Sequence, residues 1–164
     1  MPVKRQCALL LLAAGFSMIP LSLPAREDSG VLYEKGAAQA LEGRLDDAIQ
    51  TFTRSLEINP YYARAHYGIG KAYLMREGGL AKARRHLERA VELDKRMASA
   101  HYYLGLAHMF ARKYEESLHS FQRAYDYDPG MVQALYNIAS IYDYLGLEYM
   151  VKIYYSKYVT ESAE

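Results

Sequence analysis

The sequence predicts an all-α fold in which four helix-turn-helix units follow one another along the chain. The main observation is a small residue that recurs at intervals of 34, 35 and 34 residues, at Gly36, Gly70, Gly105 and Ala139. The second is that each interval holds two amphipathic stretches separated by turn-forming residues such as Glu42-Gly43-Arg44. A fixed period of this length is typical of a repeat array, because a single helical hairpin cannot cover its own apolar face.

The overall composition fits a folded repeat domain and excludes several classes of protein. A chain of 164 residues has room for one domain or a short run of repeats, but not for a multidomain enzyme. Hydrophobic residues make up 51% and charged residues 24%, which is a globular composition. Lys and Arg total 20 against 19 Asp and Glu, so no excess charge favours nucleic acid as a partner. The 17 tyrosines need a structural explanation.

The central part of the chain, residues 64–96, is rich in lysine and arginine. Arg84 and Glu88, and likewise Arg89 and Glu92, have the spacing of ion pairs on a helix. We therefore expect a solvated outer face in this part of the chain. The alternative is a patch for an acidic partner or for lipid headgroups.

The first 25 residues have the features of a secretory signal peptide. Lys4 and Arg5 supply the positive start, the apolar stretch 7–16 follows, and Ala25 is an acceptable cleavage site. We therefore expect a mature chain of residues 26–164 that is periplasmic or secreted. The alternative is an uncleaved membrane anchor, because the apolar stretch 7–23 is at the lower length limit for crossing a bilayer. Only in that case would the membrane be a partner.

The sequence contains no catalytic, metal-binding or cofactor-binding motif. Cys7 is the single cysteine and lies in the predicted signal segment, so the mature chain has no thiol. The five histidines lack the H-E-x-x-H spacing, and neither a glycine-rich phosphate loop nor a G-x-S-x-G motif occurs. His66 and His101 share a repeat position with Leu32 and Leu135, which favours packing. We expect no enzyme, and neither metal nor cofactor.

Further positions recur in register with the small residue. The second stretch of each unit has a large apolar residue at Phe52, Leu87, Phe121 and Tyr155, and Pro60 and Pro129 close the first and third units. This pattern resembles the tetratricopeptide repeat (TPR), over about residues 29–164. The expected repeats are about 29–62, 63–97, 98–131 and 132–164. The resemblance implies a right-handed superhelical solenoid whose concave inner face is lined by the first helix of each unit.

Helical spacing places a tyrosine of each unit on this inner face: Tyr33, Tyr67, Tyr102 and Tyr136, each three residues before the small residue. The same spacing adds Arg64, Lys71, Met75, Tyr103, Met109, Phe110, Asn137 and Tyr144. Tyrosine offers a large contact area at a low entropy cost, which suits an extended peptide or a partner helix. We therefore predict a partner-binding inner face. The alternative is that these tyrosines pack against neighbouring helices.

The best-known ligand of the resembled family is the C-terminal carboxylate of a chaperone, which is gripped by Lys, Asn and Arg side chains on first helices. Tyr33 and Ala37 stand at two of these positions in the first unit, and Gly68 stands at a third in the second. Ser99 and Tyr103 replace the cations of the third unit. We therefore do not expect a chaperone tail as the ligand.

The last predicted helix, residues 147–159, is apolar around most of its circumference. Repeat arrays usually end in a cap with a polar outer face, and this sequence has none. We predict docking through Met150, Ile153, Tyr154 and Tyr158, either to a second copy as a homodimer or to a larger complex. The alternative is that the tyrosine hydroxyls, Lys152, Ser156 and Lys157 solvate the helix.

These features together predict an exported scaffold without catalysis that binds a protein or peptide. By analogy with exported relatives of this repeat class, the expected role is assembly of a bacterial envelope complex, of the pilus or secretion type. Two alternatives stay open. One is a structural subunit that docks through its C-terminal helix, and the other is an accessory regulator of an envelope enzyme.

Overall fold

The computed structural model describes residues 28–163, and these fold into eight α-helices without a strand. The helices are α1 (Ser29–Leu41), α2 (Leu45–Ile58), α3 (Ala63–Leu74), α4 (Leu80–Leu93), α5 (Ala98–Phe110), α6 (Tyr114–Tyr127), α7 (Gln133–Tyr144) and α8 (Glu148–Glu161). The predicted signal segment lies outside the described residues.

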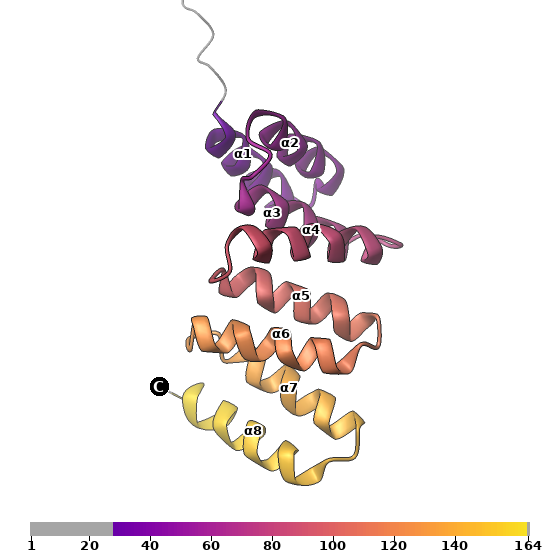
Figure 1. Ribbon diagram of the computed structural model, residues 1–164, viewed down its shortest axis with the longest axis vertical. Coiled ribbons are helices and arrows are strands. Elements are labelled where there is room, and N and C mark those ends of the chain that lie inside the picture. Colours follow the sequence, from indigo (N-terminus) through magenta and orange to yellow (C-terminus); the bar gives the residue numbers. More distant parts are fainter. Residues whose placement is uncertain (1–27, 164) are drawn as a thin grey trace, which may run out of the picture.

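Consecutive helices pair into four hairpins, and each hairpin stacks on the next (Figure 1). The first helices follow one another along one side, because α3 contacts both α1 and α5. α1 and α8 lie at opposite ends of the stack, so each end exposes one hairpin that has a neighbour on one side only (Figure 1). The predicted all-α solenoid of four helical hairpins is confirmed.

The recurring small residue lets the two helices of a hairpin approach closely. A Cβ atom at Gly70 would lie 2.6 Å from Leu87 Cγ, and one at Gly105 would lie 2.7 Å from Phe121 Cδ1. These distances are too short for any side chain, so the large residue of the second helix packs directly on the backbone of the first. This is the packing that the sequence period predicts.

Glycine adopts the left-handed conformation in the turns that follow three of the four first helices, each time two residues before the second helix begins. Gly43, Gly78 and Gly146 have φ angles of 77°, 70° and 70°. A residue after the last helical turn commonly takes this conformation, and glycine does so without a steric cost. In the third repeat the same position is Arg112, with a φ angle of 58°. Arg112 is the single non-glycine residue with positive φ among the described residues.

Two buried polar atoms without a hydrogen-bond partner occupy the same repeat position. They are Gln39 Oε1 and His108 Nδ1. Both residues lie three positions after the small residue of their repeat, where the other repeats have Tyr73 and Tyr142. An orphaned buried polar atom costs folding free energy, so this position is a weak point of the first and third hairpins.

The outer surface carries the ion pairs that the helical spacing predicts. Arg84 Nε lies 3.4 Å from Glu88 Oε1, and Arg89 Nη1 lies 2.9 Å from Glu92 Oε2. All four side chains are on α4 and contact solvent. Exposed pairs of this kind contribute little stability, about 0.3–0.5 kcal/mol each, so they mainly keep the outer face soluble.

Candidate protein-binding surface

A hollow of about 340 Å³ opens on the inner face between α1 and α3. Four of the predicted inner-face residues, Tyr33, Tyr67, Lys71 and Met75, lie in its lining. The other lining residues are mostly small or apolar: Ala37, Ala40, Leu41, Phe52, Gly68 and Ala72. The small residues of α1 and α3 do not fill the space between these helices, and the larger lining residues surround that space. The hollow therefore suits an apolar side chain of a ligand.

Tyr33 lies in the lining of this hollow and is itself nearly buried. Its side chain is only 9% exposed, and its ring centroid lies 5.5 Å from that of Phe52. Arg64 covers the ring, with Cζ 4.4 Å from the centroid, and its Nη2 atom lies 3.3 Å from Glu34 Oε1. The guanidinium is thus engaged both with an aromatic face and with a carboxylate. The inner face at this point offers contact area more than free positive charge.

Tyr103 links the inner faces of the second and third repeats. Its ring centroid lies 5.7 Å from that of Tyr67 and 5.6 Å from that of Tyr102, both with edge-to-face geometry. Lys71 Nζ lies 5.1 Å from the Tyr103 centroid. Burial, aided by the Tyr103 and Tyr33 phenols, raises the pKa of Tyr67 to about 12. The Tyr67 hydroxyl also has a side-chain hydrogen bond with Ser99, which opposes this rise in the pKa.

The aromatic cluster reaches the fourth repeat through Asn137 but not through Tyr136. Asn137 Nδ2 donates a hydrogen bond of 3.1 Å to Tyr102 Oη, and Met109 packs on the buried core of α6 and α7. Tyr136 instead faces α8, with its ring centroid 5.5 Å from that of Tyr158. The four predicted tyrosines thus do not form one continuous row of touching rings.

A row of exposed apolar residues follows the edge of the inner face. It consists of the last residues of α1, α5 and α7 and the residue that follows α3: Leu41, Phe110, Tyr144 and Met75. Leu41 is 88% exposed and was missed by the sequence analysis. The repeat spacing could have identified Leu41, because it lies 34 residues before Met75, just as Phe110 lies 34 residues before Tyr144. We call these four residues the edge row.

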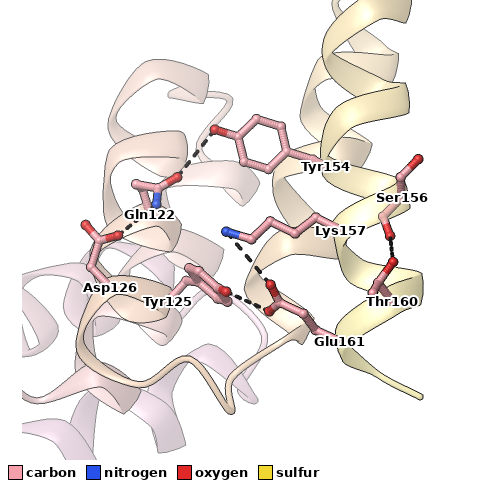
Figure 2. Close-up of polar contacts among 8 residues, drawn as sticks. All are labelled: Gln122, Tyr125, Asp126, Tyr154, Ser156, Lys157, Thr160 and Glu161. Carbon is pink, nitrogen blue, oxygen red and sulfur yellow. Dashed lines mark hydrogen bonds and ion pairs between the residues drawn. The ribbon is translucent and has the colours of Figure 1, made fainter. Parts of the chain in front are cut away.

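The predicted docking residues of α8 fall on different faces of that helix. Tyr154 faces α6, where its hydroxyl donates to Gln122 Oε1 over 3.4 Å (Figure 2). Tyr125 Oη donates to Glu161 Oε2 over 2.6 Å beside it. Tyr158 and Met150 are partly covered, whereas Ile153 is exposed. Tyr154 therefore fastens α8 to α6, and it does not present a free surface.

Residues 28–163 were also searched for metal-binding groups and for membrane-spanning helices. No group of three or more His, Cys, Asp or Glu side chains in this range is placed to hold a metal ion. No helix in the same range is long and apolar enough to cross a membrane.

A stack of helical hairpins with an aromatic, partly hollow inner face defines a solenoid scaffold of the protein-binding class. Comparison of the sequence with models of protein families leads to the same class. Residues 36–76 match the model for "TPR repeat", and residues 67–109 and 98–131 match models for "Tetratricopeptide repeat". These overlapping matches span more than half of the chain. The protein therefore belongs to the tetratricopeptide-repeat proteins.

Solved structures of similar fold include bacterial and human proteins. The crystal structure of MamA superposes with a TM-score of 0.77 at 24% identity, covering 82% of this chain and 78% of that one. MamA from Desulfovibrio magneticus RS-1 gives 0.74 at 24% identity, with coverages of 83% and 76%. The first TPR of Spaghetti (RPAP3), bound to the HSP90 peptide SRMEEVD, gives 0.69 at 25% identity, with coverages of 73% and 94%. No curated protein sequence matches the chain.

Proposed function

We propose that this protein is a scaffold that binds an extended peptide or a helix of a partner protein on its inner face. The observation that carries the proposal is the apolar hollow between α1 and α3, which lies beside the exposed side chains of Leu41 and Met75. A ligand could place one apolar side chain in the hollow and continue along the edge row. The RPAP3 neighbour supports peptide binding as a property of this fold, because its structure holds a peptide.

The site of action that we propose is the periplasm or the exterior of a bacterial cell. The signal-like residues 1–25 support export, and a solenoid with a protein-binding inner face suits the assembly of an envelope complex such as a pilus or secretion apparatus. A structural subunit that docks through α8 is the second candidate, favoured by the exposed apolar residues of that helix. Regulation of an envelope enzyme has no specific observation in its favour.

Site-specific photo-crosslinking in the native cell tests the inner face. A photoreactive residue replaces Met75 or Phe110 of the edge row. In matched controls it replaces Glu57 or Glu92, which are exposed on the second helices α2 and α4. The proposal expects the same crosslinked partner from positions 75 and 110, and none from the two controls. Crosslinks that form equally from all four positions would contradict an inner-face site.

Export is tested separately on the same cells. Cell fractionation and N-terminal sequencing should find the protein outside the cytoplasm with residue 26 as its first residue. A cytoplasmic protein that retains Met1 would overturn the envelope role while leaving the binding surface untouched.

A further inference from the structure

In each of the first three repeats, the first helix of the next repeat packs on the face that points toward the C-terminus. The corresponding face of the fourth repeat has no such helix among residues 28–163. Phe52, Leu87 and Phe121 are 2%, 0% and 0% exposed, whereas Tyr155 at the same repeat position is 50% exposed. In the first three repeats a following hairpin buries this position. In the fourth repeat nothing among residues 28–163 does so.

A second repeat position shows the same break. Leu56, Val91 and Tyr125 each pack against a buried cluster that includes residues of the following first helix. The equivalent residue of α8, Val159, is 49% exposed. Tyr155 and Val159 lie four residues apart and therefore share one side of α8. We call this side, together with the exposed side of α7, the end face.

The end face also has a hollow. A space of about 330 Å³ lies between α7 and α8 and is lined by Tyr136, Ala139, Ser140, Asp143, Val151 and Tyr155. Tyr154 and Glu161, which fasten α8 to α6, are not among these lining residues. The hollow thus combines apolar lining residues with the polar Ser140 and Asp143, and protein interfaces commonly combine the two kinds.

The three internal interfaces show what kind of helix fits such a face. Each docking helix buries a small residue, an aliphatic residue four positions later, and Ala or Ile three positions after that. The sets are Ala65, Ile69 and Ala72 in α3; Ala100, Leu104 and Ala107 in α5; and Ala134, Ile138 and Ile141 in α7. The aliphatic residue packs with the large residue of the preceding hairpin, as Ile69 does with Phe52.

A second copy of the chain has no free helix of this kind among its described residues. The equivalent positions of α1 are Val31, Lys35 and Ala38, so a charged and exposed lysine stands where the aliphatic residue is needed. The docking sides of α3, α5 and α7 are already buried within their own array. α8 buries no residue and carries Val151, Tyr155 and Tyr158 at its packing positions, none of them small.

We infer that the end face binds an amphipathic helix of a different protein, one that carries the pattern small-x-x-x-aliphatic-x-x-Ala/Ile. The bound helix takes the place of the first helix of a fifth repeat. Its aliphatic residue enters the hollow beside Tyr155, and its small residues let the backbone approach α8. This site is separate from the inner face, so it stands or falls independently of the peptide binding proposed there. It deepens the second candidate function, docking through α8, by stating what kind of partner α8 would bind.

A synthetic peptide of residues 130–145 serves as the probe, because it contains the α7 docking pattern. Short helices are marginal in water, so a covalent bridge between positions 136 and 140, both exposed in α7, holds the peptide helical. Fluorescence anisotropy with the full chain should show saturable binding. A peptide with Ile138→Lys, which copies the lysine of α1, should bind at least about tenfold more weakly, because it loses the aliphatic side chain that packs beside Tyr155.

Protein variants locate the bound peptide. Tyr155→Lys should weaken binding at least about tenfold, because it places a charge at the centre of the end face. Ile153→Lys is the matched control, since Ile153 is similarly exposed but lies about 200° around α8 from Tyr155. Equal binding by the two variants, or no saturable binding of the bridged peptide by the wild type, overturns the inference.

Two other occupants are distinguished in the same experiments. If sedimentation shows a dimer that Tyr155→Lys dissociates and the peptide does not, the end face is a contact between copies, and the partner-helix inference is wrong. If a chain of residues 28–164 binds the peptide at least about tenfold more tightly than the full chain, the N-terminal segment covers the end face. That result would also overturn the inference.

Discussion

The ring of Phe52 occupies the space that a side chain at Gly68 would need. A Cβ atom at position 68 would lie 2.7 Å from Phe52 Cζ, across the interface between the first and second hairpins. In the next interface the sizes are reversed, because the smaller Leu87 packs near the larger Tyr103. In these two interfaces the side-chain volumes thus compensate, which explains why glycine stands at position 68 where the next repeat has Tyr103.

Gly68→Ala should destabilise the protein by about 1–3 kcal/mol, because Phe52 must shift within a close-packed interface. The cost should shrink in a Phe52→Leu background, since leucine leaves room for the added methyl group. Urea denaturation of the two single variants and the double variant gives the coupling free energy. Equal costs in both backgrounds would show that the clash is with something other than the ring.

Arg112→Gly should stabilise the protein, by up to about 1 kcal/mol, because glycine adopts a positive φ without a steric cost. The turns after the other three first helices already have a glycine at this position, two residues before the second helix: Gly43, Gly78 and Gly146. The melting temperature of the variant is the measurement. Gly43→Ala is the opposite control and should lower it, since its added Cβ meets no atom within 4 Å and only backbone strain remains.

His108→Tyr should stabilise the third hairpin by about 1 kcal/mol at neutral pH. The substitution removes the orphaned Nδ1 atom and installs the residue that fills the same position at Tyr73 and Tyr142. Gln39→Tyr makes the same test in the first hairpin, because Gln39 Oε1 is orphaned as well. If both variants lose stability, the tyrosine ring does not fit these two hairpins and overpacking outweighs the gain.

The repeat architecture could be predicted from the sequence because it depends on spacing alone. One small residue per period, facing one large residue on the second helix, fixes how each hairpin closes, and Gly70 with Leu87 shows the outcome. The solvent exposure of Tyr33 could not be predicted in the same way. It depends on the cover provided by Arg64 and on the ring of Phe52, both brought there by long-range packing.

The end of the array was predicted only in outline. The apolar character of the last helix is visible in the sequence, but the side that each residue faces is set by how α8 lies on α6 and α7. Tyr154 is used in that contact, whereas Tyr155 is left exposed. Two adjacent tyrosines thus have opposite roles, and composition does not say which of them is packed and which is exposed. A comparison of equivalent positions between repeats does, because Tyr155 stands where the other repeats have a core residue.

The stability of the protein should fall as the pH falls from about 7 to about 4. His66 Nε2 donates to Pro60 O over 3.3 Å, so His66 Nδ1 accepts from His86 Nδ1 over 3.2 Å. Burial, with His66 and Arg85 adding to it, lowers the pKa of His86 to about 4. Burial also lowers the pKa of His66. The unfolded chain takes up protons below a pKa of about 6.5, whereas the folded chain does not.

The melting temperature measured from pH 7 to pH 4 checks this dependence. Each histidine adds less than about 1.4 kcal/mol per pH unit, because solvent screens these partly exposed groups. His86→Gln should flatten the profile in part. Some dependence should remain, since burial lowers the pKa of His101 and of His108 as well. A flat wild-type profile, or one that His86→Gln leaves unchanged, contradicts the assignment to this pair.

The inner face should not bind a peptide that ends in a free carboxylate of the SRMEEVD type. The binding positions of such a tail need free cations and amides, but here Tyr33 is buried under Arg64, Gly68 has no side chain, and Tyr103 is occupied with Lys71. Arg64 is itself paired with Glu34. Calorimetric titration with SRMEEVD should show no saturation below about 1 mM, a free energy weaker than about −4 kcal/mol. The contrary result would be micromolar binding that is lost when the peptide is C-terminally amidated. It would mean that Lys71 and Arg64 leave their aromatic partners to bind the ligand, and that the inner face is a carboxylate site.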